Sequence, residues 1–287
     1  MYFLTDSANH LRRLMINRGA SIGSAQQSIS ANGERSYRLK EDLKREQIRL
    51  VASIWPDANS LFDLLAYFRL LRDHKCPTPS LVIPYLAYAR EYDEPGQAKI
   101  NEMLAELVRN LNPAKISVFD LHDPRLLANL GANARIVNTW PLLAERLLKD
   151  DAPEVVLAPD EAAKPLAQAL INLLGGTAEL AYIEKERPKP NSALANNLVG
   201  EVSNRRVLIA DDIIDTGATM IEAVRLVSQK GASQIRLAAN HGIFTQDARE
   251  KLSRLPIQDI YVTNTWPQPR HPIIKTVDIS SLLITLP

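Results

Sequence analysis

The amino-acid sequence predicts an α/β protein in which mostly parallel sheets are flanked by helices. Short apolar, β-branched runs alternate with amphipathic stretches through most of the 287 residues. Strands that alternate with helices form βαβ units, which produce a parallel sheet and bring ligands to the carboxyl ends of its strands. The expected strands span residues 48–53, 80–84, 116–120, 155–158, 180–183, 207–210, 234–239 and 257–262.

Helices are predicted where apolar residues recur at spacings of three and four, because that spacing places them on one face of a helix. Segments of this kind lie between the expected strands, at residues 61–71, 100–111, 162–174 and 220–229. The regular alternation of the two kinds of segment is what predicts the fold class.

Composition excludes several classes of function. The chain is 46% hydrophobic and 23% charged with a net charge of +1, so nothing global points to nucleic acid or to an acidic membrane surface. Cys76 is the single cysteine, which rules out an intrachain disulfide and favours a reducing, cytoplasmic location. No apolar run approaches the ~20 residues needed to cross a bilayer. We therefore expect neither a nucleic-acid nor a membrane partner.

Two parts of the chain share one plan. Strand 48–53 leads through WPDANS into helix 61–71, and strand 207–210 leads through DDIIDTGAT into helix 220–229. This pattern predicts two similar α/β domains, residues 1–142 and 143–287. The general likeness of all βαβ units explains the pattern equally well.

The strongest local signal is the segment VLIADDIIDTGAT, an apolar strand followed by spaced acids and a small-residue turn into a helix. Free N–H groups at a helix start bind anions, and a turn rich in small residues and hydroxyls suits a phosphate. Carboxylates at the strand end can accept the hydroxyls of a ribose or hold a divalent cation. The candidate residues are Asp211, Asp212, Asp215, Thr216, Gly217, Ala218 and Thr219. A solvated strand end and an ordinary helix cap at Thr216 are the plain alternatives.

This segment resembles the PRPP-binding loop of the phosphoribosyltransferase-like family, where two acids and two apolar residues precede DTG, a small residue and Thr. Further segments resemble ribose-phosphate pyrophosphokinases in particular, in chain order over nearly the whole sequence. They are VIPYLAYARE (82–91), SVFDLHD (117–123), LAPDEAA (157–163), IEKERPKP (183–190), AANHGIF (238–244) and VTNT (262–265). The resemblance implies two phosphoribosyltransferase-like domains and the synthesis of PRPP from ATP and ribose 5-phosphate.

Roles for individual residues follow from the same resemblance. It implies ribose 5-phosphate binding by the loop 211–219, catalysis by Lys185 and Arg187, and Mg²⁺ binding by His122 and Asp160. It also implies nucleotide binding by Asn32, Glu34, Arg90 and Glu91, and assembly into a homo-oligomer, either a dimer or a hexamer. Taken alone, a histidine at a strand end is more often structural, and EKERPKPN reads as a solvated turn.

The sequence departs from the family mainly on the nucleotide side. The F-x-D-G-E segment is SANGE here, so Ser30 replaces a stacking aromatic residue, and the basic run after Arg90 reads EYDEPG. Fewer arginines should weaken nucleotide affinity. Three readings stay open: a divergent synthetase, a non-catalytic paralogue that binds sugar phosphate and regulates a partner, and a phosphoribosyltransferase that uses PRPP.

Overall fold

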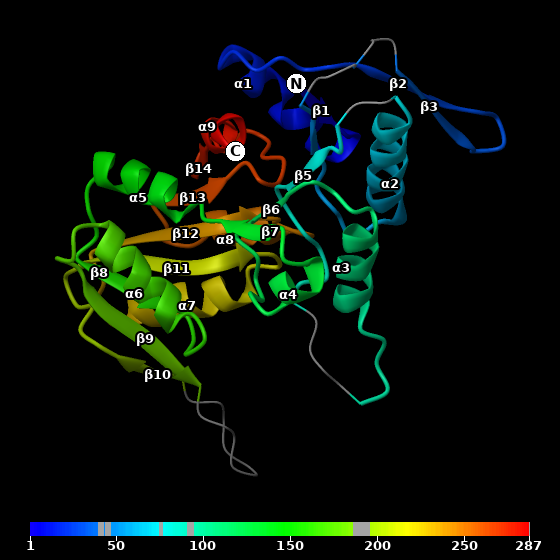
Figure 1. Ribbon diagram of the computed structural model, residues 1–287. Coiled ribbons are helices and arrows are strands. Elements are labelled where there is room, and N and C mark those ends of the chain that lie inside the picture. Colours follow the sequence, from blue (N-terminus) through cyan, green and yellow to red (C-terminus); the bar gives the residue numbers. More distant parts are fainter. Residues whose placement is uncertain (40–42, 44–46, 75–76, 91–94, 186–195, 287) are drawn as a thin grey trace. The chain divides into compact units, whose positions relative to one another are not determined.

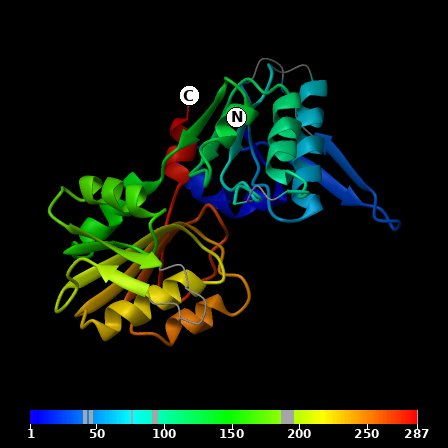
Figure 2. The ribbon, with the colours of Figure 1, turned by 90° about the horizontal axis from the view of Figure 1, so that it is seen from below.

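The chain forms two compact units. The computed structural model describes residues 1–39, 43, 47–74, 77–90, 95–185 and 196–286, without the side chains of Lys185 and Asn196. The first unit comprises Met1–Asn138 and Ser280–Pro287, and the second comprises Thr139–Ile279. Each unit has its own sheet, drawn in Figures 1 and 2.

The first unit is built on a parallel sheet of five strands. Its order follows the chain, β1-β4-β5-β6-β7, and every neighbouring pair is parallel. The strands are β1 (Tyr2–Leu4), β4 (Arg49–Val51), β5 (Ser80–Ile83), β6 (Ile116–Phe119) and β7 (Ala134–Val137). The crossover helices are α2 (Ala58–Asp73), α3 (Ile100–Asn110) and α4 (Leu126–Leu130). Right-handed crossovers that all step in one direction place these helices on the same face of the sheet.

One apolar cluster confirms that arrangement. Alternate strand residues such as Leu50, Leu81 and Ile116 pack with Phe68 of α2 and Leu104 of α3, all of them buried. Alternate residues of a strand point to one face of a sheet, so these strand residues share the face that α2 and α3 cover.

The remaining elements of the first unit include a hairpin and the C-terminal helix. The hairpin pairs β2 (Ala25–Ile29) with β3 (Arg35–Leu39), and two short helical segments precede it, η1 (Asp6–Leu11) and α1 (Arg12–Asn17). Helix α9 (Ser280–Thr285) belongs to this unit because Tyr2 Oη donates to the Leu283 carbonyl at 3.3 Å and Arg18 Nε donates to Ser280 Oγ at 2.7 Å. The chain therefore passes from one compact unit to the other between residues 138 and 139, and back again between residues 279 and 280. The sequence pattern predicted one boundary, between residues 142 and 143.

The second unit has a sheet of seven strands in the order β10-β9-β8-β11-β12-β13-β14. Only the β9–β10 pair of this sheet is antiparallel. The strands are β8 (Val155–Ala158), β9 (Glu179–Lys185), β10 (Asn196–Val199), β11 (Arg206–Ile214), β12 (Gln234–Gly242), β13 (Asp259–Thr263) and β14 (Ile274–Val277). The helices are α5 (Trp140–Lys149), α6 (Lys164–Leu173), α7 (Ala218–Gln229) and α8 (Ala248–Ser253).

The strand order of this sheet reverses between β8 and β11. From β8 the chain steps toward β9, but from β11 it steps the other way, toward β12. Because each crossover keeps its hand, the helices on the two sides of the reversal fall on opposite faces. Val156 and Leu208 accordingly pack with α5 and α6, whereas Leu157 and Ile209 pack with α7 and α8. The second unit is a sheet between two helix layers.

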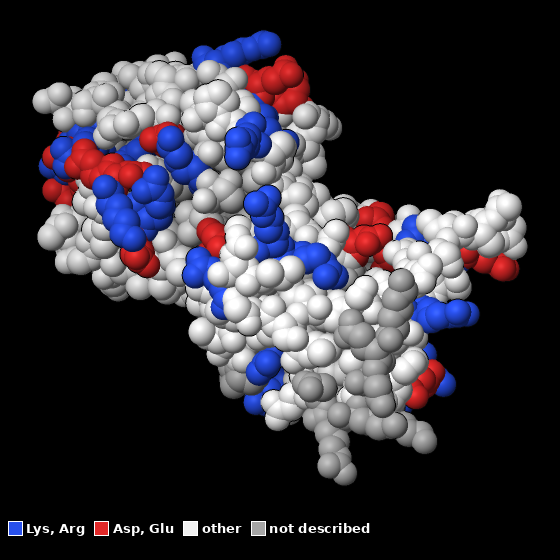
Figure 3. All heavy atoms as spheres, turned by 90° about the horizontal axis from the view of Figure 1, so that it is seen from above, with Lys and Arg blue, Asp and Glu red and all other residues white. Residues whose placement is uncertain are grey.

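The structure confirms the predicted α/β class with mostly parallel sheets flanked by helices. Each expected strand and helix corresponds to an observed one; strand 155–158 has the expected ends, and the others differ by a few residues at one end or both. None of the described helices is long and apolar enough to span a membrane. Positive and negative side chains lie near one another on the face shown in Figure 3.

Candidate active site

The point where the strand order reverses brings three carboxylates together in the second unit. Strand β8 pairs with β11 only as far as Leu157↔Ile209, whereas β11 continues beside β12 to Ile214↔Gly242. Asp211 and Asp212 thus lie on β11 beyond the part paired with β8, and Asp160 follows the end of β8. Ligands of open α/β sheets bind at this position, outside the carboxyl ends of the strands at the reversal.

The three carboxylates interact electrostatically. The amide of Asp212 donates a 2.9 Å hydrogen bond to Asp211 Oδ1. Burial raises the pKa of Asp211 to about 8, with repulsion from Asp212 and from Asp160 adding to the effect. Packing like charges together disfavours ionisation, and a cation or a set of hydroxyl donors would relieve that penalty. The arrangement therefore suits a ligand that carries hydroxyl groups or one that binds together with a cation.

The turn that follows β11 leads directly into α7. Gly217 is the N-cap of α7 with φ of +76°, and no side chain caps the helix. Thr216 Oγ1 accepts from the Ala218 amide only at 3.5 Å, so the first amides of α7 are not tightly held by it. Amides at a helix start that lack a cap are a favourable place for an anion.

Glycine at position 217 is explained by the backbone conformation. A Cβ here would point toward α8, in contact with Leu252 Cδ1 at 3.4 Å. The positive φ, which side chains disfavour, is the constraint that selects glycine.

Asp160 also has a local structural role. Its Oδ1 accepts a 3.1 Å hydrogen bond from the amide of Ala163, at the start of α6. Lys164, the first residue of that helix, forms an ion pair with Glu161 at 3.1 Å and lies 3.5 Å from the ring centre of Tyr182 on β9. The positively charged side chain of Lys164 therefore lies at the start of the helix that follows Asp160.

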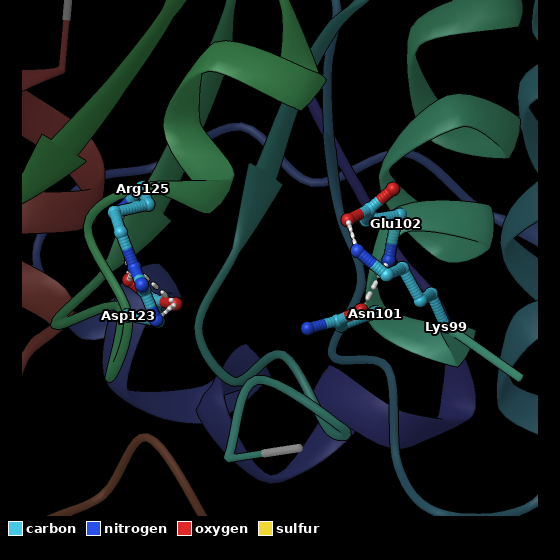
Figure 4. A network of polar contacts seen from close by, with 5 residues as sticks. All are labelled: Lys99, Asn101, Glu102, Asp123 and Arg125. Carbon is cyan, nitrogen blue, oxygen red and sulfur yellow. Dashed lines mark hydrogen bonds and ion pairs between the residues drawn. The ribbon is translucent and has the colours of Figure 1, made fainter. Parts of the chain in front are cut away.

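The predicted metal ligand of the first unit, His122, is exposed in the loop after β6. Its neighbour Asp123 forms a fork-like ion pair with Arg125, with Nη2–Oδ2 at 2.8 Å (Figure 4). The hydrogen bonds from Arg125 lower the pKa of Asp123, and the charge of His122 adds to the effect. Figure 4 also shows a second polar group, at the start of α3, where Lys99 pairs with Glu102 at 3.1 Å.

The described part of the chain holds no group of three or more His, Cys, Asp or Glu side chains arranged as metal ligands. The carboxylates at the strand reversal interact electrostatically without forming a ready-made cage. Such an arrangement fits an ion that keeps much of its coordination shell as water or phosphate oxygen, as Mg²⁺ does.

The residues predicted to bind nucleotide lie in two places of the first unit. Asn32 and Glu34 are exposed at the turn of the β2–β3 hairpin, where the Glu34 amide donates to Asn32 Oδ1 at 3.2 Å. Arg90 is exposed in the segment after β5, two residues past Tyr88, whose φ is +64°. A positive φ is unusual for a bulky side chain. Glu91 lies outside the described residues.

The two predicted catalytic residues are largely beyond the described structure. Lys185 is the last residue of β9, and its side chain is not described. Arg187 lies outside the described residues. Strand β9 adjoins β8, so the backbone of Lys185 belongs to the same sheet as Asp160 and Asp211.

Comparison with known proteins identifies the family. The family model described as the N-terminal domain of ribose phosphate pyrophosphokinase matches residues 3–111, and the phosphoribosyl synthetase-associated domain matches residues 176–285. The ribose-phosphate pyrophosphokinase of Pyrococcus furiosus is 30% identical over 285 residues, which cover 99% of this chain and 100% of that protein. The chain belongs to the ribose-phosphate pyrophosphokinase family. The enzyme of Sulfurisphaera tokodaii is 31% identical over 258 residues, covering 88% of this chain and 87% of its own length.

The family fold extends over both units. The crystal structure of phosphoribosylpyrophosphate synthetase from Mycobacterium smegmatis matches 99% of this chain and 95% of its own, with a TM-score of 0.87 at 24% identity. The resemblance seen in the sequence motifs is thereby confirmed at the level of family and fold, while the roles of single residues stay predictions.

Sequence reasoning missed one residue that contacts the loop directly. Thr245 Oγ1 donates a 2.7 Å hydrogen bond to Asp215 Oδ1. The signal was present, because Thr245 directly follows the segment AANHGIF that resembles the family. A threonine after a strand predicts no particular chemistry until its partner in space is known.

Proposed function

We propose that the protein transfers the pyrophosphoryl group of Mg-ATP to the 1-hydroxyl of ribose 5-phosphate, giving PRPP and AMP for nucleotide biosynthesis. The observation that carries this proposal is the meeting of the Asp211–Asp212 pair with an uncapped helix start at the strand reversal. A sugar phosphate needs both of these features, because its hydroxyls require acceptors such as carboxylates and its phosphate requires donors such as free amides.

Ribose 5-phosphate would lie along the loop from Asp211 to Thr219. The carboxylates of Asp211 and Asp212 accept the sugar hydroxyls, and hydroxyl donors relieve the repulsion that raises the pKa of Asp211. The phosphate would face the amides at the start of α7, together with the hydroxyls of Thr216 and Thr219. Asp215, Gly217 and Ala218 shape the turn between these two groups.

Mg²⁺ is the cofactor that this oxygen-rich set of side chains fits. Asp160 and His122 are the family's metal positions in this chain, and the excess negative charge around Asp160 and Asp211 favours a divalent cation. Bound there, Mg²⁺ would neutralise the triphosphate and orient it.

The remaining roles concern the nucleotide and the transferred group. The 1-hydroxyl oxygen attacks the β-phosphorus of ATP while the bond from that phosphorus to the α–β bridging oxygen breaks, so AMP leaves and the hydroxyl proton passes to solvent. Lys185 and Arg187 would stabilise the charge that spreads over the transferred group. The nucleotide would be held by Asn32, Glu34, Arg90 and Glu91.

Assembly and location complete the proposal. We expect a homo-oligomer, a dimer or a hexamer, in the cytoplasm. ATP and ribose 5-phosphate are its partners, and neither nucleic acid nor membrane is needed. The departures at Ser30 and after Arg90 predict weak nucleotide binding, which makes the nucleotide the substrate to vary first.

The test is a direct assay of product. The purified protein is incubated with Mg-ATP and ribose 5-phosphate, and AMP and PRPP are separated by chromatography. Wild type should form both in equal amounts, Lys185→Ala should lose at least about a hundredfold in rate, and the exposed Lys149→Ala should retain wild-type rates. Ribose 5-phosphate binding without PRPP from any nucleoside triphosphate would contradict the enzyme reading and favour the regulatory paralogue. Consumption of PRPP with a base would favour the transferase.

A further inference from the structure

We propose that Thr245 is a positioning residue for the ribose 5-phosphate loop, which it serves by holding the carboxylate of Asp215 away from the phosphate-binding amides. This inference rests on the proposed function, because it assumes that the turn 215–219 receives the phosphate. It adds a residue from the neighbouring strand connection to those of the loop itself.

Hydrogen bonds join the segment after β12 to the loop. Ile243 and Phe244 both donate their amides to the carbonyl of Ile214, at 2.9 and 3.1 Å. Thr245 then makes two bonds to Asp215, from its amide to the carbonyl at 3.1 Å and from its hydroxyl to Oδ1 at 2.7 Å. Three consecutive residues after β12 therefore hold the backbone of the loop at Ile214 and Asp215. Thr245 also holds the side chain of Asp215.

The backbone that presents Thr245 is strained. Phe244 and Gln246 have φ of +52° and +54°, a region that costs a non-glycine residue about 1–2 kcal/mol. Phe244 is held there by burial in the apolar cluster with α7 and α8, and the guanidinium of Arg249 lies 5.0 Å from its ring centre. Packing in the core thus fixes the backbone conformation of Phe244, and this conformation sets the position of the next residue, Thr245.

The hydroxyl bond prevents a competing interaction within the loop. An aspartate readily accepts hydrogen bonds from backbone amides two or three residues further along the chain, which from Asp215 are those of Gly217 and Ala218. A carboxylate in that position would occupy the donors that a phosphate needs and would repel its charge. With Oδ1 bound to Thr245, α7 instead begins without a side-chain cap.

This role differs from a purely structural one in a measurable way. Thr245 is exposed, so loss of its hydroxyl opens no cavity in the core. Thr245→Val keeps the shape of the side chain but removes the hydroxyl donor from Asp215 Oδ1, so this oxygen can turn toward the amides that begin α7. The resistance to urea should then stay the same or rise, while the affinity for ribose 5-phosphate falls.

Calorimetric titration of ribose 5-phosphate into the whole protein tests the proposal. Thr245→Val should bind about tenfold more weakly than wild type, the effect of one hydrogen bond to a charged group. Thr245→Ser, which keeps the donor, should restore tight binding. Thr285→Val is the matched control, because Thr285 is exposed on α9 and its hydroxyl donates to the Ser281 carbonyl at 3.0 Å.

The outcomes separate this inference from the proposed function. Wild-type affinity in Thr245→Val overturns the inference, as does equal weakening by Val and Ser together with earlier unfolding in urea. Wild type that binds ribose 5-phosphate but makes no PRPP overturns the proposed function, and the Thr245 comparison still decides this point. Wild type that binds no ribose 5-phosphate overturns both.

Discussion

The amide of Asp212 donates to Oδ1 of Asp211 at 2.9 Å, so the two acids near the end of β11 are held side by side. We predict that Asp211→Asn raises the free energy of unfolding at pH 8 by at least about 1 kcal/mol, because it removes a charge that burial and its neighbours oppose. The same change should lower PRPP formation by at least about tenfold. Urea unfolding and the product assay measure the two effects, and a variant that is both less stable and fully active would contradict this account.

The pKa of Asp211 also predicts how stability depends on pH. A pKa raised to about 8 means that the folded protein binds a proton that the unfolded chain has released above about pH 4. The free energy of unfolding should therefore fall as the pH rises from 4 to 8, by at most about 1.4 kcal/mol per pH unit from this group. Urea unfolding at several pH values should show a shallower decline in Asp211→Asn, and identical slopes in the two proteins would count against the raised pKa.

The hairpin of the first unit depends on a buried acid on α2. Asp63 Oδ1 accepts from Tyr37 Oη at 2.5 Å and from Arg35 Nη1 at 2.9 Å, and only 4% of Asp63 is exposed. Asp63→Ala should lower the free energy of unfolding by about 3 kcal/mol, because it removes the acceptor of both hydrogen bonds, whereas Tyr37→Phe should lower it by about 1 kcal/mol. Denaturant titration distinguishes them. Ribose 5-phosphate affinity should not change, since the loop belongs to the second unit.

Backbone strain at Gly217 can be separated from packing. Gly217→Ala should destabilise the protein by about 1–2 kcal/mol, because alanine disfavours a φ of +76°, whereas its Cβ would make an ordinary contact with Leu252 Cδ1 at 3.4 Å. Gly19 has a similar φ of +84° with no atom near its Cβ position, so Gly19→Ala measures the strain alone. Similar losses at the two positions, measured by thermal unfolding, are the expected result, and a much larger loss at Gly217 would show that packing against Leu252 matters.

Much of the fold could be predicted from the sequence, because buried parallel strands are short apolar runs. Strand 207–210 was predicted to end before the acids, yet β11 extends to Ile214. The extension comes from pairing with β12, including Asp211↔Ala239 and Ile213↔His241, which local polarity does not reveal. The β2–β3 hairpin was not predicted because its strands are mostly polar, although the Asn32-Gly33 pair at its turn is a known hairpin signal.

The candidate site could be predicted only in part. The segment from Asp211 to Thr219 is continuous in sequence, so its motif was visible. The proximity of Asp160 depends on the strand reversal, and the bond from Thr245 depends on the strained turn at Phe244. Assignment of α9 to the first unit rests on contacts such as that from Tyr2 to Leu283 between the two ends of the chain, which no local pattern predicts.

The central claim is that ribose 5-phosphate binds to the carboxylates and turn of the second unit. Calorimetric titration of ribose 5-phosphate, with Mg²⁺ present, into wild type, Asp212→Asn and the exposed Asp73→Asn of α2 tests it most directly. Wild type and Asp73→Asn should show saturable binding, and Asp212→Asn should bind at least about tenfold more weakly. Equal affinity in all three proteins would contradict it.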